Sequence, residues 1–151
     1  MKFDSRPDTW RHIHAVRGFL GQVIADLQQR AHEHDQSKLV APELAVFDRY
    51  TPLLAATTYG SEEYMAHLAG MAEGLRHHYS VNDHHPEHFA FGIDDMNLVQ
   101  LLEMLCDWKA ATLRHAHGDL GRSIDQNAKR FSYDGQLRDV LRNTARDFGW
   151  L

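Results

Sequence analysis

The sequence is most informative at His34 and Asp35, a histidine-aspartate doublet with Lys38 three residues beyond the aspartate. The doublet offers an imidazole nitrogen and a carboxylate oxygen, which are ligands that Fe, Mn, Zn and similar ions accept. The chain has 12 histidines in 151 residues, so further imidazole ligands are plentiful. The doublet therefore indicates a metal site, although it does not define a substrate.

Further candidate ligands come from three other parts of the chain. One histidine continues the apolar stripe of a predicted helix, and three more lie in a predicted loop over residues 80–94. Asp107 shares a polar strip with Gln100, Glu103 and Arg114 on an otherwise apolar helix, where an isolated charged carboxylate would be too costly. The candidate metal ligands are His34, Asp35, His78, His84, His85 and Asp107, with His88 as a further loop histidine.

Each of these residues also has an ordinary explanation when it is taken alone. His34 would be a positive charge at a helix end, His78 a hydrogen-bonded core residue, and Asp107 the partner of Arg114. Taken together, they favour binding of one or two divalent transition metal ions, namely Fe, Mn, Zn, Co or Ni. A pair of ions could hold a phosphate group and activate a water molecule.

The elements that must position these residues are predicted to be helices. Apolar residues recur at steps of three and four, and no segment alternates with a period of two. The expected fold is all-α, a compact bundle of five to seven helices forming a single domain over residues 1–151. The predicted helices cover about residues 9–33, 43–55, 62–79, 95–117, 123–130 and 136–148.

Composition and charge limit the classes of partner. The net charge is −5 with neutral histidines, and there is no basic run, which argues against polymeric DNA or RNA. The single cysteine, Cys106, cannot form an internal disulfide, and no apolar run approaches the roughly 20 residues that cross a bilayer. The N-terminus lacks an apolar signal region. We therefore expect a cytoplasmic protein that does not insert in membranes; its oligomeric state is open, and a homo-oligomer is possible.

The string His34-Asp35-x-Ser37-Lys38 resembles the His-Asp-x-Gly-Lys string of the HD-domain metal-dependent phosphohydrolases, an all-α superfamily. The resemblance implies that His34, Asp35 and Asp107 are primary metal ligands. It further implies that His78 and His85 bind a second ion and that Lys38 contacts phosphate.

The whole chain is also similar to an uncharacterised family of small bacterial and phage proteins. The similarity rests on Pro42-Glu43, His84-His85-Pro86-Glu87-His88 and Glu103-Met104-Leu105-x-Asp107-Trp108, among other motifs. It implies no established activity.

One departure from the HD pattern concerns its first histidine. The counterpart would be His12 or His14, and His12 lies 22 residues before His34. On a continuous helix this separation is about 33 Å, too far to share an ion. We therefore leave His12 out of the site and expect Glu103 or a loop histidine in its place.

The leading functional expectation is a metal-dependent phosphohydrolase acting on a small phosphorylated molecule, with a nucleotide as the expected substrate. Glu103 or Glu87 would act as general base, and Lys38 with Arg114 or Arg130 would offset the phosphate charge. Asn127 and Arg130 share a helix face that is either an anion site or simply exposed. Two alternatives remain: an HD-like di-iron oxygenase, and a non-catalytic helical binding module with a structural metal ion.

Overall fold

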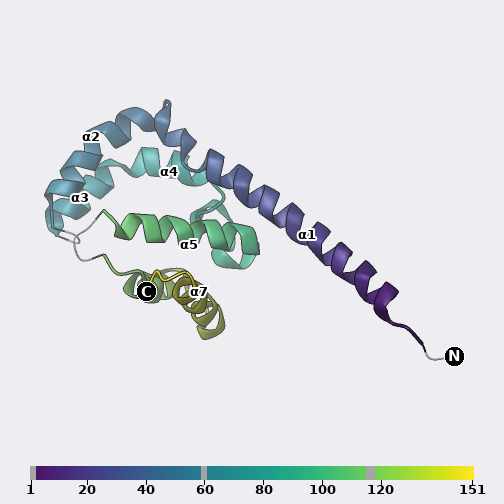
Figure 1. Cartoon of the computed structure of the whole chain (residues 1–151). Helices are drawn as coiled ribbons and strands as arrows, with labels where there is room; N and C mark the ends of the chain where they lie inside the picture. The colour runs from purple at the N-terminus through teal and green to yellow at the C-terminus, as the bar shows by residue number, and fades with distance from the viewer. Residues whose placement is uncertain (1–2, 59–60, 115–117) are drawn as a thin grey trace. The chain divides into compact units, whose positions relative to one another are not determined.

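The computed structural model describes residues 3–58, 61–114 and 118–151, and this part of the chain is all-helical (Figure 1). The α-helices are α1 (Arg6–Glu33), α2 (Glu43–Ala56), α3 (Glu62–Gly70), α4 (Ala72–Val81), α5 (Leu98–Thr112), α6 (Leu120–Phe131) and α7 (Gly135–Asp147). Short 3₁₀ helices are η1 (Gln36–Leu39), η2 (Pro86–His88) and η3 (Gly92–Asp95). The predicted fold class is confirmed.

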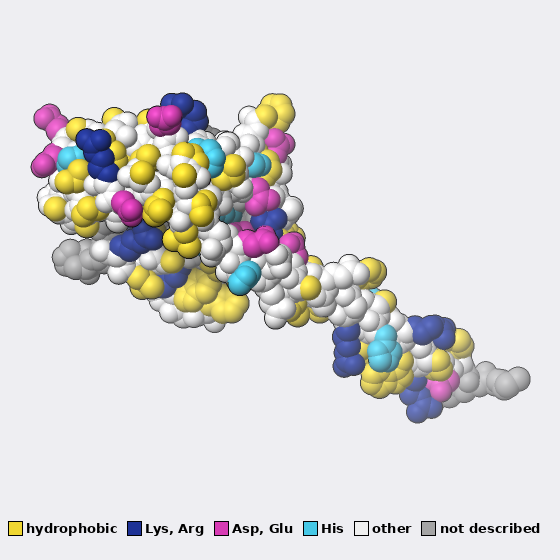
Figure 2. Space-filling view, turned by 90° about the horizontal axis from the view of Figure 1, so that it is seen from above, with side chains coloured by type: hydrophobic (Ala, Val, Ile, Leu, Met, Phe, Trp, Pro, Cys, Tyr) yellow, Lys and Arg dark blue, Asp and Glu magenta, His cyan; other side chains and the backbone are white. Residues whose placement is uncertain are grey.

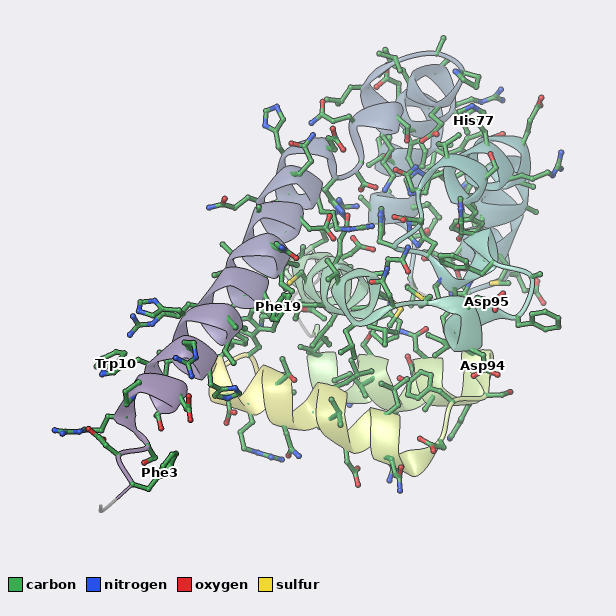
Figure 3. All side chains as sticks on the ribbon, turned by 90° about the vertical axis from the view of Figure 1, so that its right-hand side faces the viewer. Phe3, Trp10, Phe19, His77, Asp94 and Asp95 are labelled. Atoms are coloured by element: carbon green, nitrogen blue, oxygen red, sulfur yellow. The ribbon has the colours of Figure 1, made fainter. Side chains whose placement is uncertain are left out.

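The chain divides into two compact units, Met1–His34 and Asp35–Leu151. The first unit is essentially the helix α1, with a proline in its first turn and no interruption at its glycines. Because the helix is continuous, His12 and His34 are about 33 Å apart along it, as expected. Trp10 and Phe19 project from α1 (Figure 3), and the described residues of this unit include no second helix to cover them.

The second unit contains all the other helices. Helices α2, α3 and α4 pack together, and α5 packs against α6, which packs against α7. Figure 1 shows α5 running between these two groups. The apolar core lies where α5, α6 and α7 meet, and Trp108 packs against both of its clusters. Buried core residues are Ile93, Leu101, Met104, Leu105, Leu120, Ile124, Leu141 and Ala145.

The predicted helix over 62–79 is two helices, α3 and α4, that meet at Met71. Gly70 stands at the junction, where a Cβ atom would lie 2.5 Å from the Tyr50 hydroxyl oxygen. Gly74 faces Val46 of α2 in the same way, with a Cβ atom 2.8 Å from Cγ1. The two glycines therefore let α2 approach α3 and α4 closely, at the cost of weak helix propensity at the junction.

The other boundaries follow from side-chain caps. Asn97 and Gln100 form a reciprocal capping box that begins α5, and Asp134 caps the backbone N–H of Leu137 in α7. Asp119 accepts a hydrogen bond from the Arg122 backbone N–H, so α6 begins at Leu120, earlier than predicted. Helix α5 ends at Thr112, short of the predicted residue 117, although residues 115–117 lie outside the described part.

The surface is mixed in charge. Figure 2 shows acidic and basic side chains interspersed over the face that α2 and α3 cover. Among the described helices, none combines the length and the apolar character needed to span a membrane.

Candidate metal centre

Asp35 opens the second unit and presents its carboxylate to the histidines of α4 and the following loop. Its backbone is left-handed, with φ of 59°, and it precedes η1 directly. The Lys38 ammonium donates to Asp35 Oδ2 at 2.6 Å and also lies 5.1 Å from the centre of the Phe47 ring. This ion pair fixes the carboxylate so that Oδ1 lies 3.3 Å from Nε2 of His78.

His78 is held between two carboxylates and is 1% exposed. Its Nδ1 lies 2.9 Å from Glu43 Oε2, and its Nε2 lies 2.8 Å from Nε2 of His85. A carboxylate at Nδ1 accepts a hydrogen bond from the Nδ1–H group, so the proton stays on Nδ1 and the lone pair is on Nε2. Carboxylates hold metal-binding histidines in this way in many proteins. His78 is therefore oriented as a ligand toward Asp35 and His85.

Glu43 is fully buried at the first turn of α2 and organises this side of the site. It also contacts Nδ1 of His77 at 2.8 Å and accepts a hydrogen bond from the Ser37 hydroxyl at 3.0 Å. Asn82 donates to Ser37 in turn, at 2.9 Å. Burial alone would raise the pKa of Glu43, but the hydrogen bonds from His77, Ser37 and His78 outweigh it and hold that pKa below its ordinary value. Glu43 is therefore a charged carboxylate that can orient His78.

His84 is arranged like His78 but faces a different carboxylate. Its Nδ1 lies 3.3 Å from Glu103 Oε1 on α5, and its Nε2 lies 3.6 Å from Asp35 Oδ1. The adjacent Asp83 is anchored by the buried Gln100, whose side-chain amide donates to it at 2.7 Å. The loop after α4 is thus fastened to α5, and His84 is held with its Nε2 toward Asp35.

These side chains together form a candidate metal centre of Asp35, His78, His84 and His85. One ligand atom from each of the four lies within 4.8 Å of those from the others. Burial and the neighbouring His84 and His78 lower the pKa of His85 to about 3, with Asp107 opposing the shift. Burial and Lys38 likewise lower the pKa of His78. Neutral imidazoles beside a carboxylate are a donor set that suits Fe, Mn, Zn, Co or Ni, so these residues fit the expected ions.

Three other predicted residues, described next, are not part of this group. His34 follows α1 as the last residue of the first unit, one peptide bond before Asp35, and its role as a ligand stays a prediction. Arg114 is exposed in the turn after α5 ends. His88, the third loop histidine, is also exposed and contacts the Tyr79 carbonyl oxygen through Nδ1 at 2.9 Å.

A cavity of about 480 Å³ adjoins the centre and is here called the polar cavity. His85 and Asp107 line it on one side, and α6 supplies Ser123, Asn127 and Arg130 to its wall. The Arg130 guanidinium donates to Glu87 at 2.5 Å. The structure therefore brings five predicted site residues to one space: His85, Glu87, Asp107, Asn127 and Arg130.

Sequence reasoning missed the residues that orient the ligands. Glu43 was named only within the Pro42-Glu43 motif, and an acid in the first turn of a helix is common and does not by itself indicate a site. Ser37 lies within the His34-to-Lys38 string, and Asn82 lies one helical turn after His78. The sequence positions of Ser37 and Asn82 therefore place both residues close to predicted ligands. The signal for Glu43 was its place in the Pro42-Glu43 motif of the similar uncharacterised family.

Comparison with known proteins identifies the family but no established activity. Residues 1–147 match the Family of unknown function (DUF5662). The chain belongs to this family. The match spans nearly the whole sequence and confirms the expected similarity to an uncharacterised family. No match was found among curated proteins or among solved structures. The resemblance to HD-domain phosphohydrolases stays a prediction.

Proposed function

We propose that this protein is a metal-dependent phosphohydrolase that acts on a small phosphorylated molecule. The observation that carries the proposal is that the polar cavity is lined by His85 of the candidate metal centre and by Arg130 and Asn127. A site for an anionic group therefore adjoins a site for a cation. This arrangement suits metal-assisted hydrolysis of a phosphate ester.

Asp35, His78, His84 and His85 would hold the ion, and Asp107, which lines the polar cavity beside His85, would be a ligand for a second one. When bound, a divalent ion would lower the pKa of a water molecule bound to it and would offset negative charge on phosphate. Glu43 and Glu103 keep the Nε2 atoms of His78 and His84 directed toward Asp35. We therefore assign Glu103 to positioning His84.

The α6 wall would bind the phosphate group. Arg130 offers a planar guanidinium that can donate two parallel hydrogen bonds, and Asn127 and Ser123 offer an amide and a hydroxyl. Glu87 already pairs with Arg130 in the same cavity, so it is placed to accept a proton from water as the phosphate replaces it on the guanidinium. Lys38 supports Asp35 through its ion pair, and its contact with phosphate stays a prediction.

The cavity also bears on the alternatives. A structural metal site is closed by its protein ligands, whereas here His85 and Asp107 border a space large enough for a ligand. This favours a site that admits substrate. A di-iron oxygenase would use the same ligand types, and we separate it from a hydrolase by its need for iron and oxygen.

The test begins with metal content by mass spectrometry on untagged protein. Asp35→Ala should lose the bound ions, and Asp107→Ala should lose at least part of them. Asp94→Ala, on the exposed η3 turn (Figure 3), is the matched control and should keep the native content. A metal content that is unchanged in Asp35→Ala would rule out the proposed metal centre.

The second arm measures phosphate release from nucleotides and phosphomonoesters by protein loaded with Mn²⁺ or Fe²⁺. Release that is lost in Asp35→Ala and kept in Asp94→Ala supports the hydrolase. Iron-specific oxygen consumption without phosphate release would replace the hydrolase with an oxygenase. Unfolding on chelation, with neither activity, would indicate a structural ion.

A further inference from the structure

A second cavity borders the polar cavity and differs from it in character. It has a volume of about 630 Å³ and lies over α3 and α4. Apolar and aromatic side chains dominate its lining, chiefly Tyr64, Met65, Leu68, Leu75 and Tyr79. We call it the apolar cavity.

The two cavities share two side chains, Tyr79 and Arg130. Arg130 interacts electrostatically with the Tyr79 hydroxyl and pairs with Glu87, and because Tyr79 and Arg130 line both spaces, this pair of residues forms the wall between them. Burial and the Glu87 carboxylate raise the pKa of Tyr79, so the phenol stays protonated beside the guanidinium. A ligand group bound by Arg130 in the polar cavity therefore lies directly beside the apolar cavity.

The lining chemistry identifies what each cavity accepts. The polar cavity offers the Arg130 guanidinium and the hydrogen-bonding groups of Ser123 and Asn127, beside the carboxylates of Glu87 and Asp107. The apolar cavity offers two tyrosine rings and two leucine side chains, with Arg76 as its other charged residue. Rings that stack on aromatic and guanidinium planes, including nucleobases, suit such a lining. Both volumes are in the range of small-molecule sites.

We propose that the substrate is a phosphate ester of a ring-bearing, largely apolar alcohol, with phosphate in the polar cavity and the ring in the apolar cavity. This rests on the proposed function in taking phosphate as the group bound beside the metal centre. Arg130 contacts the phosphate from the boundary, and Tyr79 contacts the first atoms of the organic group. Esters of small aliphatic alcohols leave the apolar cavity empty and bind more weakly.

The experiment measures binding, so that it does not depend on turnover. Calorimetry compares benzylphosphonate with methylphosphonate on the full chain in the presence of Mn²⁺. Burial of one ring predicts affinity about tenfold to a hundredfold higher for benzylphosphonate. Ala72→Trp, at an exposed position lining the apolar cavity, should remove this preference while methylphosphonate binds as before.

The control is Ala66→Trp, an equal change at an exposed position of α3 outside the lining residues, which should keep the preference. Met65→Trp is a second filling variant should Ala72→Trp fold poorly, as judged by its melting temperature. Equal affinities in the native chain, no binding of either compound, or a preference that survives both filling variants would overturn the proposal.

Hydrolysis is scored separately on benzyl phosphate and ethyl phosphate. A benzylphosphonate preference without phosphate release would support binding of a ring-bearing phosphate compound across the two cavities and would rule out the hydrolase. Equal phosphate release from both esters, with equal phosphonate affinities, would keep the hydrolase and remove this proposal.

Discussion

The metal centre and the apolar core of α5, α6 and α7 are both deeply buried, but burial has opposite consequences in the two regions. His78 and His84 are 1% and 2% exposed, and Leu105 and Ile124 are 0% exposed. Removing a leucine or isoleucine side chain from water stabilises the folded state by about 1.5 to 3 kcal/mol. Burying imidazole and carboxylate groups costs free energy unless hydrogen bonds or an ion compensate.

This difference indicates that the apolar core stabilises the fold, whereas the metal centre is buried at a cost to stability that ion binding would offset. The core needs only apolar packing, which Leu120, Leu141 and Ala145 provide across two short helices. In the centre, the buried groups are carboxylates that face histidine nitrogens. A bound cation would stabilise this arrangement. We therefore expect substitutions in the two regions to separate stability from ion binding.

The largest expected effect is on stability, from Leu105→Ala in the core. Leu105 is fully buried among α5, α6 and α7, so its truncation leaves a cavity. The free energy of unfolding should fall by about 2 to 5 kcal/mol, measured by urea denaturation. Metal content per folded molecule should stay at the native value. Loss of metal from the folded variant would show that the two regions are not separable.

Glu43→Gln should have the next largest effect, and it should act on the ion. The amide is nearly the same size but offers His78 Nδ1 no charged acceptor. Metal affinity should fall by about tenfold to a hundredfold, as for other residues that orient ligands. Competition with a chelator of known affinity measures this change. Glu62→Gln, at an exposed position in the first turn of α3, is the control. Equal affinities in both variants would contradict the orienting role.

The same contrast explains how much the sequence could predict. Core helices carry a periodic apolar pattern, and α2 and α7 begin and end within about a residue of the predicted bounds. The break at Met71 was missed because it depends on Gly70 meeting Tyr50 of another helix, a contact that no local pattern encodes. The start of α6 at Leu120 was missed although Asp119 is a typical capping residue.

The candidate centre was predictable in its ligand types but less so in its supporting residues. Asp35, His78, His84 and His85 were named from their types and positions, and the structure gathers them. Glu43 lies 35 residues before His78, and a single acid at a helix start has many ordinary uses. Glu103 was expected as a base or ligand, whereas its position at His84 Nδ1 follows only from the packing of α5 beside the loop.

The pH dependence of metal-free protein should come from the centre. The pKa of His85 is about 3 in the folded chain and has an ordinary value of 6.5 when unfolded. Between these values the unfolded state binds the extra proton, so stability is present above about pH 6.5 and falls as pH falls. The slope should be at most about 1.4 kcal/mol per pH unit for this proton.

Urea unfolding in chelator between about pH 5 and 7.5 measures this slope. The range stays above the region where carboxylates such as Glu43 take up protons. His85→Gln should reduce the slope, and the lowered pKa of His78 should account for part of what remains. His88→Gln, at an exposed loop position, should leave the profile unchanged. A flat profile in the native chain, or an unchanged slope in His85→Gln, would contradict the assignment.

The smallest expected effects come from one chemical change, loss of a tyrosine hydroxyl, made once in the core and once at the wall between the two cavities. The Tyr133 hydroxyl donates to the Ile124 carbonyl oxygen at 2.7 Å, and burial raises the pKa of Tyr133 to about 12. Tyr133→Phe should lower the free energy of unfolding by about 1 kcal/mol without changing phosphonate binding. Tyr79→Phe removes a hydroxyl that contacts Arg130 at the cavity wall, so it should weaken phosphonate binding and change stability less. If Tyr79→Phe instead lowered stability as much as Tyr133→Phe and left binding intact, Tyr79 would belong to the structural region and the wall between the cavities would have no role in binding.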